Sequence, residues 1–169
     1  MVEPWQHPLP SLDGYNRSFE AARQGAAAGR GGVAQLWADR LPAQVHLWRQ
    51  RPEDGVLWVA VTGLLPAPLL VGLVYLPPAN SGGCPADLPG WWMRLEGDVA
   101  AAAAQGLIIL AGDFNARTAN APDWPADSEP GCGPRRSSDA AQLNSHGRSL
   151  LQLCSSAGLL LCNGRTGPR

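Results

Sequence analysis

The sequence has no excess of positive charge, no closely spaced cysteines and no charged residue over a long central stretch. Its 13 basic and 14 acidic side chains give a net charge of −1, so any contact with a polyanion must be local rather than driven by a general positive field. The four cysteines form no CxxC pair and have no histidine at ligand spacing, which argues against a zinc site and a small disulfide scaffold. We therefore expect a reducing, intracellular setting.

A secretory signal and a membrane helix are both disfavoured. Residues 1–6 contain no basic segment followed by an apolar one. The uncharged stretch 55–86 is long enough to raise the question of a membrane span, but glycines and prolines divide it into two runs of strand length, 56–61 and 69–75. We expect two buried strands and no membrane contact, with a membrane span as the less favoured alternative. The breaking residues are Gly63, Pro66, Pro68 and Gly72.

What is present fits one domain with a core, because 45% of the 169 residues are hydrophobic and only 16% are charged. A glycine turn precedes an expected strand at 33–37, and 44–48 is expected to pair with it. With the two strands above, they predict an antiparallel meander.

The second half of the chain predicts helices, strands and one long loop. Asp87 can cap a helix that ends before Gly106, because apolar residues follow at helical spacing. A strand at 107–111 comes next, then a loop over 116–140 that is rich in Pro, Gly, Asp and Ser. A further apolar stripe predicts a helix ending at Gly158, and 159–162 is expected to form another core strand. This mixed order favours a layered α/β fold.

The strand at 107–111 runs directly into Gly112, Asp113, Phe114 and Asn115. Because side chains alternate along extended backbone, Asp113 and Asn115 can point the same way, while Phe114 turns back into the core. Gly112 is expected to leave room for a ligand beside them. A carboxylate and a carboxamide in this arrangement suit a hard cation and a phosphate ester, so the segment predicts phosphoester chemistry.

A wider set of motifs resembles the endonuclease/exonuclease/phosphatase superfamily. Tyr75-Leu76-Pro77-Pro78, followed after a helix by Gly-Asp-Phe-Asn at 112–115, is similar to its core motifs. The endonuclease domains of non-LTR retrotransposons are the most similar branch, because their downstream pattern resembles residues 136–165 and their Glu-Thr-Trp segment resembles Glu3-Pro4-Trp5. The downstream matches are Arg136-Ser137-Ser138-Asp139, Asn144, Gly147-Arg148, Leu150-Leu151, Leu153-Cys154, Gly158-Leu159 and Asn163-Gly164-Arg165.

The resemblance implies a partial four-layered α/β sandwich of the deoxyribonuclease-I-like type, lacking terminal strands and covering 1–169 as a single incomplete domain. It implies Tyr75, Asp113 and Asn115 as catalytic residues and Glu3 as the ligand of Mg²⁺ or Mn²⁺. Arg117 and Arg136 are candidates for contacting the DNA phosphate backbone.

The chain departs from the family in ways that lead us to expect a fragment. The family's earlier Asn strand and final Asp-His pair have no counterpart, because His7, His46 and His146 do not match the terminal His. The first hypothesis is a metal-dependent endonuclease that nicks DNA for retrotransposon insertion, which implies the nucleus and is compatible with an associated reverse transcriptase domain in the full-length element. The alternatives are a catalytically inactive truncated remnant and a small-molecule phosphoesterase of the same superfamily. The nuclease interpretation requires Tyr75 and Asp113 to lie on the same side of the molecule.

Overall fold

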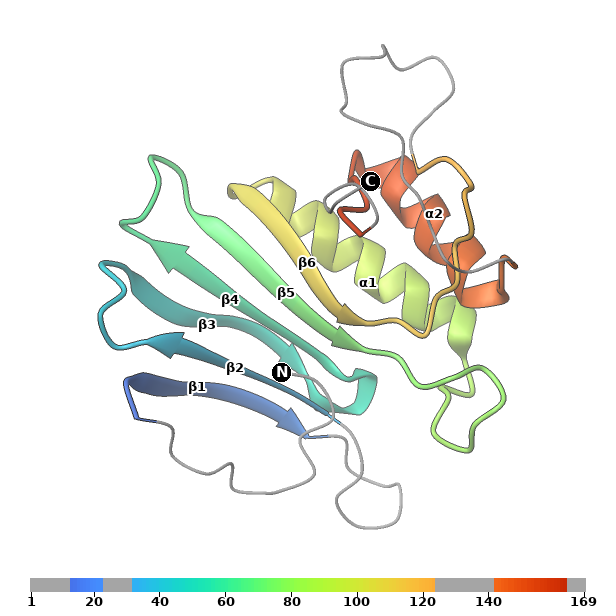
Figure 1. Ribbon diagram of the computed structural model, residues 1–169, viewed down its shortest axis with the longest axis horizontal. Coiled ribbons are helices and arrows are strands. Elements are labelled where there is room, and N and C mark those ends of the chain that lie inside the picture. Colours follow the sequence, from blue (N-terminus) through green and yellow to red (C-terminus); the bar gives the residue numbers. More distant parts are fainter. Residues whose placement is uncertain (1–12, 23–31, 124–141, 164–169) are drawn as a thin grey trace. The chain divides into compact units, whose positions relative to one another are not determined.

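A computed structural model describes residues 13–22, 32–123 and 142–163. The chain divides into two compact units, Met1–Phe114 and Asn115–Arg169, and each is described by itself. Within the described residues the fold is mixed α/β, with a four-stranded sheet and two helices longer than one turn (Figure 1). The expectation of one incomplete domain stays a prediction, because two compact units can belong to a single domain.

The first unit contains two sheets. Strands β1 and β2 form an antiparallel pair, and the other four strands form a sheet in the order β3-β4-β5-β6. The first three of these are antiparallel neighbours, whereas β6 runs parallel to β5 and is reached through helix α1. The elements are β1 (Tyr15–Ala22), β2 (Gly32–Ala38), β3 (Gln44–Arg51), the 3₁₀ turn η1 (Pro52–Asp54), β4 (Val56–Thr62), β5 (Leu69–Tyr75), α1 (Leu88–Ala103) and β6 (Leu107–Asp113).

The expected meander is confirmed for β3, β4 and β5, but the expected pairing of the strand at 33–37 with that at 44–48 is wrong. Strand β2 pairs with β1, a strand that the sequence did not predict, and β3 pairs with β4. The physical reason is the direction in which β2 buries its side chains. Val33 packs against Leu57 and Leu73 on the face of the four-stranded sheet, so β2 lies over that sheet instead of extending it.

Helix α1 begins where the sequence predicts. The side chain of Asp87 accepts a hydrogen bond from the Gly90 backbone N–H at 3.0 Å, which satisfies one of the donors that a helix leaves free at its start. Pro89 lies in the first turn, where a missing N–H costs no helical hydrogen bond. The apolar stripe predicted for this helix is buried, with Trp91, Leu95, Val99 and Ala102 at its centre.

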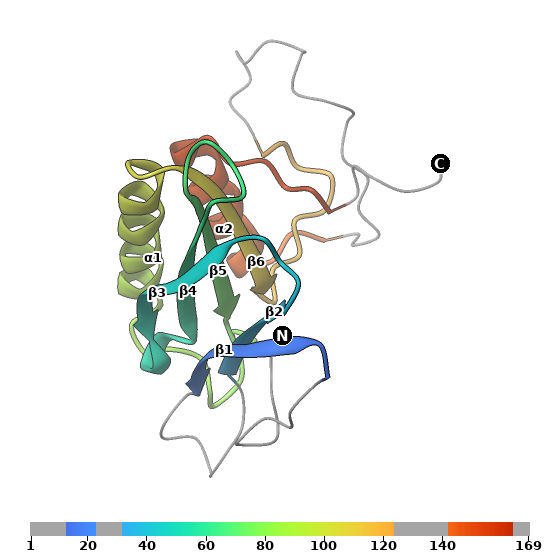
Figure 2. The same cartoon turned by 90° about the vertical axis from the view of Figure 1, so that its left-hand side faces the viewer.

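The four-stranded sheet is covered differently on its two faces. On one face, Leu57, Leu73 and Tyr75 form a core cluster with Val33 of the β1–β2 sheet. On the other face lies α1, whose Trp91 indole donates a hydrogen bond to the Asp54 carbonyl at 2.8 Å. Figure 2 shows α1 on one side of this sheet. The first unit is therefore layered, as the mixed order of elements predicted.

The second unit contains α2 (Ser145–Ala157), which Asn144 caps and which ends at Gly158 with a φ of 65°. The described part of the predicted loop, 116–123, has neither helix nor strand, and residues 124–140 lie outside the described residues. The strand expected at 159–162 is wrong. The backbone N–H of Leu159 donates to the Cys154 carbonyl and that of Leu161 donates to the Asp123 side chain, so these donors are not used in a sheet ladder.

Candidate functional site

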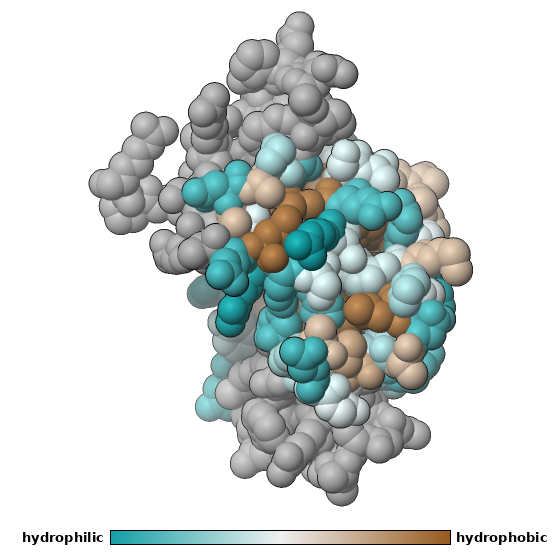
Figure 3. Space-filling model, turned by 90° about the vertical axis from the view of Figure 1, so that its right-hand side faces the viewer, coloured by the Kyte–Doolittle hydropathy of each residue, from teal (hydrophilic) through white to brown (hydrophobic). Residues whose placement is uncertain are grey.

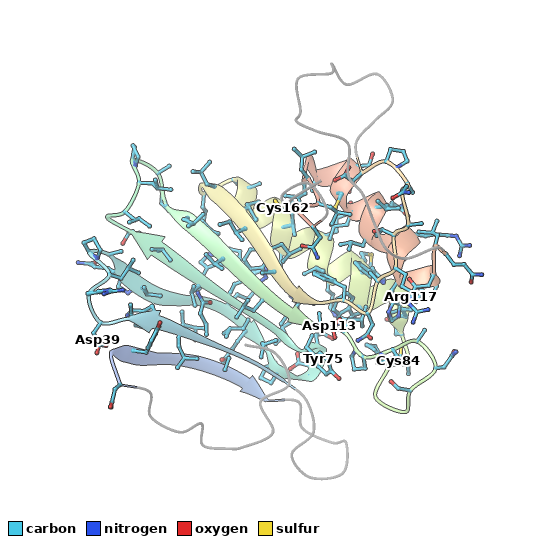
Figure 4. All side chains as sticks on the ribbon, in the orientation of Figure 1. Asp39, Tyr75, Cys84, Asp113, Arg117 and Cys162 are labelled. Carbon is cyan, nitrogen blue, oxygen red and sulfur yellow. The ribbon has the colours of Figure 1, made fainter. Side chains whose placement is uncertain are left out.

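Tyr75 and Asp113 occupy the last positions of the neighbouring parallel strands β5 and β6 and are partners in the strand register. Because partners in register lie on the same face of a sheet, both side chains leave the sheet on the same side, one strand spacing of about 4.8 Å apart. Figure 4 shows the two residues side by side at the ends of their strands. In open α/β sheets this edge, outside the carboxyl ends of parallel strands, is where ligands usually bind.

The backbone fixes the ends of these two strands. The Leu76 N–H donates to the Asp113 carbonyl at 2.8 Å, and the Tyr75 N–H donates to the Gly55 carbonyl at 2.9 Å. Tyr75 itself is only 8% exposed, with its ring in the core cluster formed with Val33, Leu57 and Leu73. A buried ring limits the positions available to the phenol, so Tyr75 is a structurally constrained residue and not a mobile surface aromatic.

Phe114 lies on the opposite side of the strand end, as the alternation of side chains predicted. Its ring stacks on Trp92 of α1, with 6.2 Å between ring centroids and 17° between ring planes. Trp92 in turn contacts Trp91 edge to face, with 4.9 Å between the ring centroids. This aromatic stack anchors the end of β6 to α1 and leaves Asp113, which is half-buried, on the other face.

Gly112 lies against the neighbouring strand. A Cβ at this position would lie 2.0 Å from the Val74 carbonyl oxygen, so the backbone of β5 occupies the direction that a side chain would take. The residue itself is exposed, and the expectation that it leaves room for a ligand stays a prediction. The φ of 131° is also one that side-chain-bearing residues rarely adopt. Glycine is needed here because the end of β6 closes tightly on β5.

Asn115 is the first residue of the second unit and has a φ of 46°, in the left-handed region. Its backbone carbonyl accepts a hydrogen bond from the Asn144 side chain at 2.9 Å. Arg117 is exposed, and its backbone N–H donates to the same Asn144 side chain at 3.0 Å. Asn144 is expected from the sequence only as part of the family pattern, and its capping role was not predicted. The signal for that role is an Asn three residues before Gly147 at a helix start.

Two expected site residues, Glu3 and Arg136, lie outside the described residues. In the parts of the chain that the structure does describe, no three His, Cys, Asp or Glu side chains gather as a metal-binding group. Mg²⁺ often uses only one or two protein carboxylates and several water molecules, so the single carboxylate of Asp113 fits part of such a site.

A charge cluster around two buried carboxylates, Asp54 and Asp98, was not predicted. Arg51 contacts the carboxylates of both Asp54 and Asp98, Arg49 also pairs with Asp98, and Arg94 forms two hydrogen bonds to Asp54 at 2.8 and 2.9 Å. Burial acts to raise the pKa of Asp54, but the hydrogen bonds and charges of Arg94 and Arg51 outweigh it and lower that pKa below its ordinary 3.8. The signal in the sequence was the spacing of these residues. Arg49 and Arg51 are two positions apart on a strand and therefore share a face, and Arg94 and Asp98 are four positions apart on a helix and therefore share a face as well.

Comparison of the chain with models of known families, with curated proteins and with solved structures finds no match. The resemblance to the superfamily therefore rests on the motifs alone. No helix among the described residues is long and apolar enough to cross a membrane. On the face drawn in Figure 3, the described hydrophobic residues form separate patches bordered by hydrophilic ones.

Proposed function

We propose that the chain is part of a divalent-metal-dependent phosphodiesterase of the endonuclease type, with the partial four-layered α/β sandwich of the endonuclease/exonuclease/phosphatase superfamily. The observation that supports this most is the pairing of Tyr75 with Asp113 at the carboxyl ends of two parallel strands. The two residues belong to motifs 38 positions apart in the sequence, which the resemblance assigns to one site.

The roles follow from the chemistry of each side chain. The Asp113 carboxylate accepts a hydrogen bond from the attacking water and takes up its proton as the new P–O bond forms, while the P–O bond to the leaving sugar oxygen breaks and that oxygen takes a proton from solvent water. The Tyr75 phenol donates a hydrogen bond to a phosphate oxygen, on which negative charge grows during attack. Asn115, two residues beyond Asp113 in the chain, holds the phosphate through its carboxamide. Mg²⁺ or Mn²⁺, which Glu3 would hold, supplies electrostatic stabilisation of the phosphate oxygens.

We propose DNA as the substrate, contacted along its phosphate backbone by Arg117 and Arg136. The support is the downstream pattern over 136–165, which is similar to the retrotransposon branch and not to the branches that act on small molecules. The cellular setting that follows is intracellular and nuclear, with a reverse transcriptase domain in the full element.

The direct test is the conversion of supercoiled plasmid to the nicked circle in the presence of Mg²⁺. Asp113→Asn removes the proton acceptor while keeping size, and we expect the nicking rate to fall about a hundredfold or more. Tyr75→Phe keeps the buried ring and removes only the hydroxyl, and we expect a loss of about a hundredfold. Chelation of the cation with EDTA is expected to abolish nicking.

The matched control is Asp39→Asn, which makes the same change at an exposed carboxylate after β2, far from Tyr75 in Figure 4. It should nick at the parent rate. Equal residual nicking in the parent and in Asp113→Asn would indicate contamination and favour the inactive remnant. Hydrolysis of bis(4-nitrophenyl) phosphate without plasmid nicking would instead favour a small-molecule phosphoesterase.

A further inference from the structure

The segment that follows the Gly-Asp-Phe-Asn motif is fixed to the start of α2 by one side chain. The Oδ1 atom of Asn144 accepts hydrogen bonds from the Gly147 N–H at 2.7 Å and the Arg117 N–H at 3.0 Å. Its Nδ2 atom donates to the Asn115 carbonyl at 2.9 Å. The Asn144 backbone N–H also donates to the Arg117 carbonyl at 3.1 Å. One residue thus holds both ends of the segment 115–117 and the first turn of the helix.

Gly147 makes this close approach possible. A Cβ at position 147 would lie 2.0 Å from the Arg117 carbonyl oxygen and 3.1 Å from Asn144 Oδ1. Any other residue would therefore push the segment away from the helix and break the hydrogen bonds of Asn144. Asn144 and Gly147 act as one unit, which gives a physical reason for their spacing in the sequence.

The conformation of Asn115 makes the contact relevant to chemistry. Its φ of 46° is unfavourable for most residues that carry a side chain, although Asn tolerates it better than others. The hydrogen bond from Asn144 Nδ2 to the Asn115 carbonyl fixes the peptide plane that follows Asn115. With that plane held, the backbone cannot relax to the more common extended conformation, and the direction in which the Asn115 side chain leaves the backbone is held as well.

We infer that Asn144 is a positioning residue that holds Asn115 in the backbone conformation needed to bind a phosphodiester. The inference rests on the proposed function, because Asn115 is its point of action. The Oδ1 atom caps the helix and the Nδ2 atom positions Asn115. The two tasks of the side chain are therefore carried by different atoms and can be separated by a substitution.

Asn144→Asp separates them. Aspartate is as good a helix cap as asparagine and keeps the oxygen that accepts from Gly147 and Arg117. It removes the donor to the Asn115 carbonyl and replaces it with an oxygen that repels that carbonyl. The matched control is Asp87→Asn, the reverse exchange at the cap of α1, which keeps the acceptor for Gly90. Both variants should unfold cooperatively from a folded state, and Asn144→Asp should keep slow hydrogen exchange in α2, which shows that the helix cap is retained.

The functional readout is a double-mutant cycle on plasmid nicking. Asn144→Asp should lower kcat at least tenfold with little change in KM, and it should have no additional effect in an Asn115→Ala background, because its effect passes through Asn115. Asp87→Asn should change neither constant. Additive losses in Asn144→Asp and Asn115→Ala, or a parent-like kcat in Asn144→Asp, would overturn the inference.

A second readout does not depend on catalysis. In ¹⁵N-labelled protein, the backbone and side-chain amide signals of Asn115 should move when a short DNA duplex is added, and this response should be lost in Asn144→Asp but kept in Asp87→Asn. If the parent does not nick DNA but this pattern holds, the proposed catalytic function fails and the positioning role of Asn144 stands. If the parent's Asn115 signals do not respond, or respond equally in Asn144→Asp, the positioning role is wrong.

Discussion

Tyr75 and Asp113 are register partners on the parallel strands β5 and β6, although the 16-residue helix Leu88–Ala103 and two connections of 12 and 3 residues lie between them in the chain, together with the rest of β6. Their backbones are joined by the hydrogen bond from the Leu76 N–H to the Asp113 carbonyl at 2.8 Å. Opposite Asp113, Phe114 stacks on Trp92 and so fixes which face the carboxylate takes. The two residues thus lie on the same side of the sheet, as the nuclease interpretation requires.

Gly112→Ala is expected to destabilise the first unit strongly. The added methyl would lie 2.0 Å from the Val74 carbonyl oxygen, and the φ of 131° suits only glycine. We expect the free energy of unfolding in urea to fall by about 3 kcal/mol or more. The matched control is Gly97→Ala in α1, where a Cβ meets nothing within 4 Å, and which should gain about 0.5–1 kcal/mol. Similar changes in both variants would contradict the close contact of β6 with β5.

Asp54→Asn is expected to lower the free energy of unfolding at neutral pH and to make that free energy fall less steeply as the pH is lowered. The pKa of Asp54 is lowered in the folded protein, because Arg94 and Arg51 stabilise the carboxylate more than burial disfavours it. A lowered folded pKa contributes stability that is complete above the unfolded value of about 4 and is lost as the pH falls through the folded value. Urea unfolding at a series of pH values should show a loss of about 2 kcal/mol at neutral pH, and a shallower decline in acid.

Glu53→Gln is the control for this prediction, because Glu53 is the exposed acidic neighbour of Asp54. It should leave both the neutral stability and the acid dependence close to those of the parent. An Asp54→Asn protein whose stability follows the parent's curve below pH 4 would show that the Asp54 pKa is not lowered.

Ile109→Thr is expected to reduce self-association. Ile109 is 50% exposed and Leu107 is 54% exposed, and among the described strands β6 pairs only with β5. An apolar edge strand of this kind promotes pairing between molecules. Threonine keeps the preference for extended backbone, so the unfolding free energy should change by less than about 1 kcal/mol. Sedimentation velocity should show a larger monomer fraction in Ile109→Thr than in the parent.

The control is Met93→Thr, which removes a 69% exposed apolar side chain from α1. Because helix α1 has no free strand edge, this variant should associate like the parent. Equal reduction in both variants would indicate a general effect of surface hydrophobicity, and no reduction in Ile109→Thr would contradict a role for the β6 edge.

Local pattern was enough to predict the elements of the β4–β5–α1–β6 segment. The breakers between 61 and 69 separate two strands, Asp87 and Pro89 start the helix, and the alternation at 113–114 sends Phe114 and Asp113 to opposite faces. These features depend on residues within a few positions of each other, so they can be predicted from the local sequence. Strand pairing depends on residues that are far apart in the chain, and the partner predicted for β2 was wrong.

The sequence by itself predicted which residues are suited to phosphoester chemistry, and it determined where strands β2 to β6 and helix α1 of the first unit form, but not where β1 forms. Only the tertiary structure decided that Tyr75 and Asp113 are neighbours, that Gly112 packs too closely on β5 to carry a Cβ, that Asn144 contacts Asn115, and that five charged residues meet between β3, η1 and α1. The physical reason is that each of these contacts joins residues that are far apart in the chain. The sheet register and the packing of the layers bring them together, and a local pattern in the sequence does not specify either.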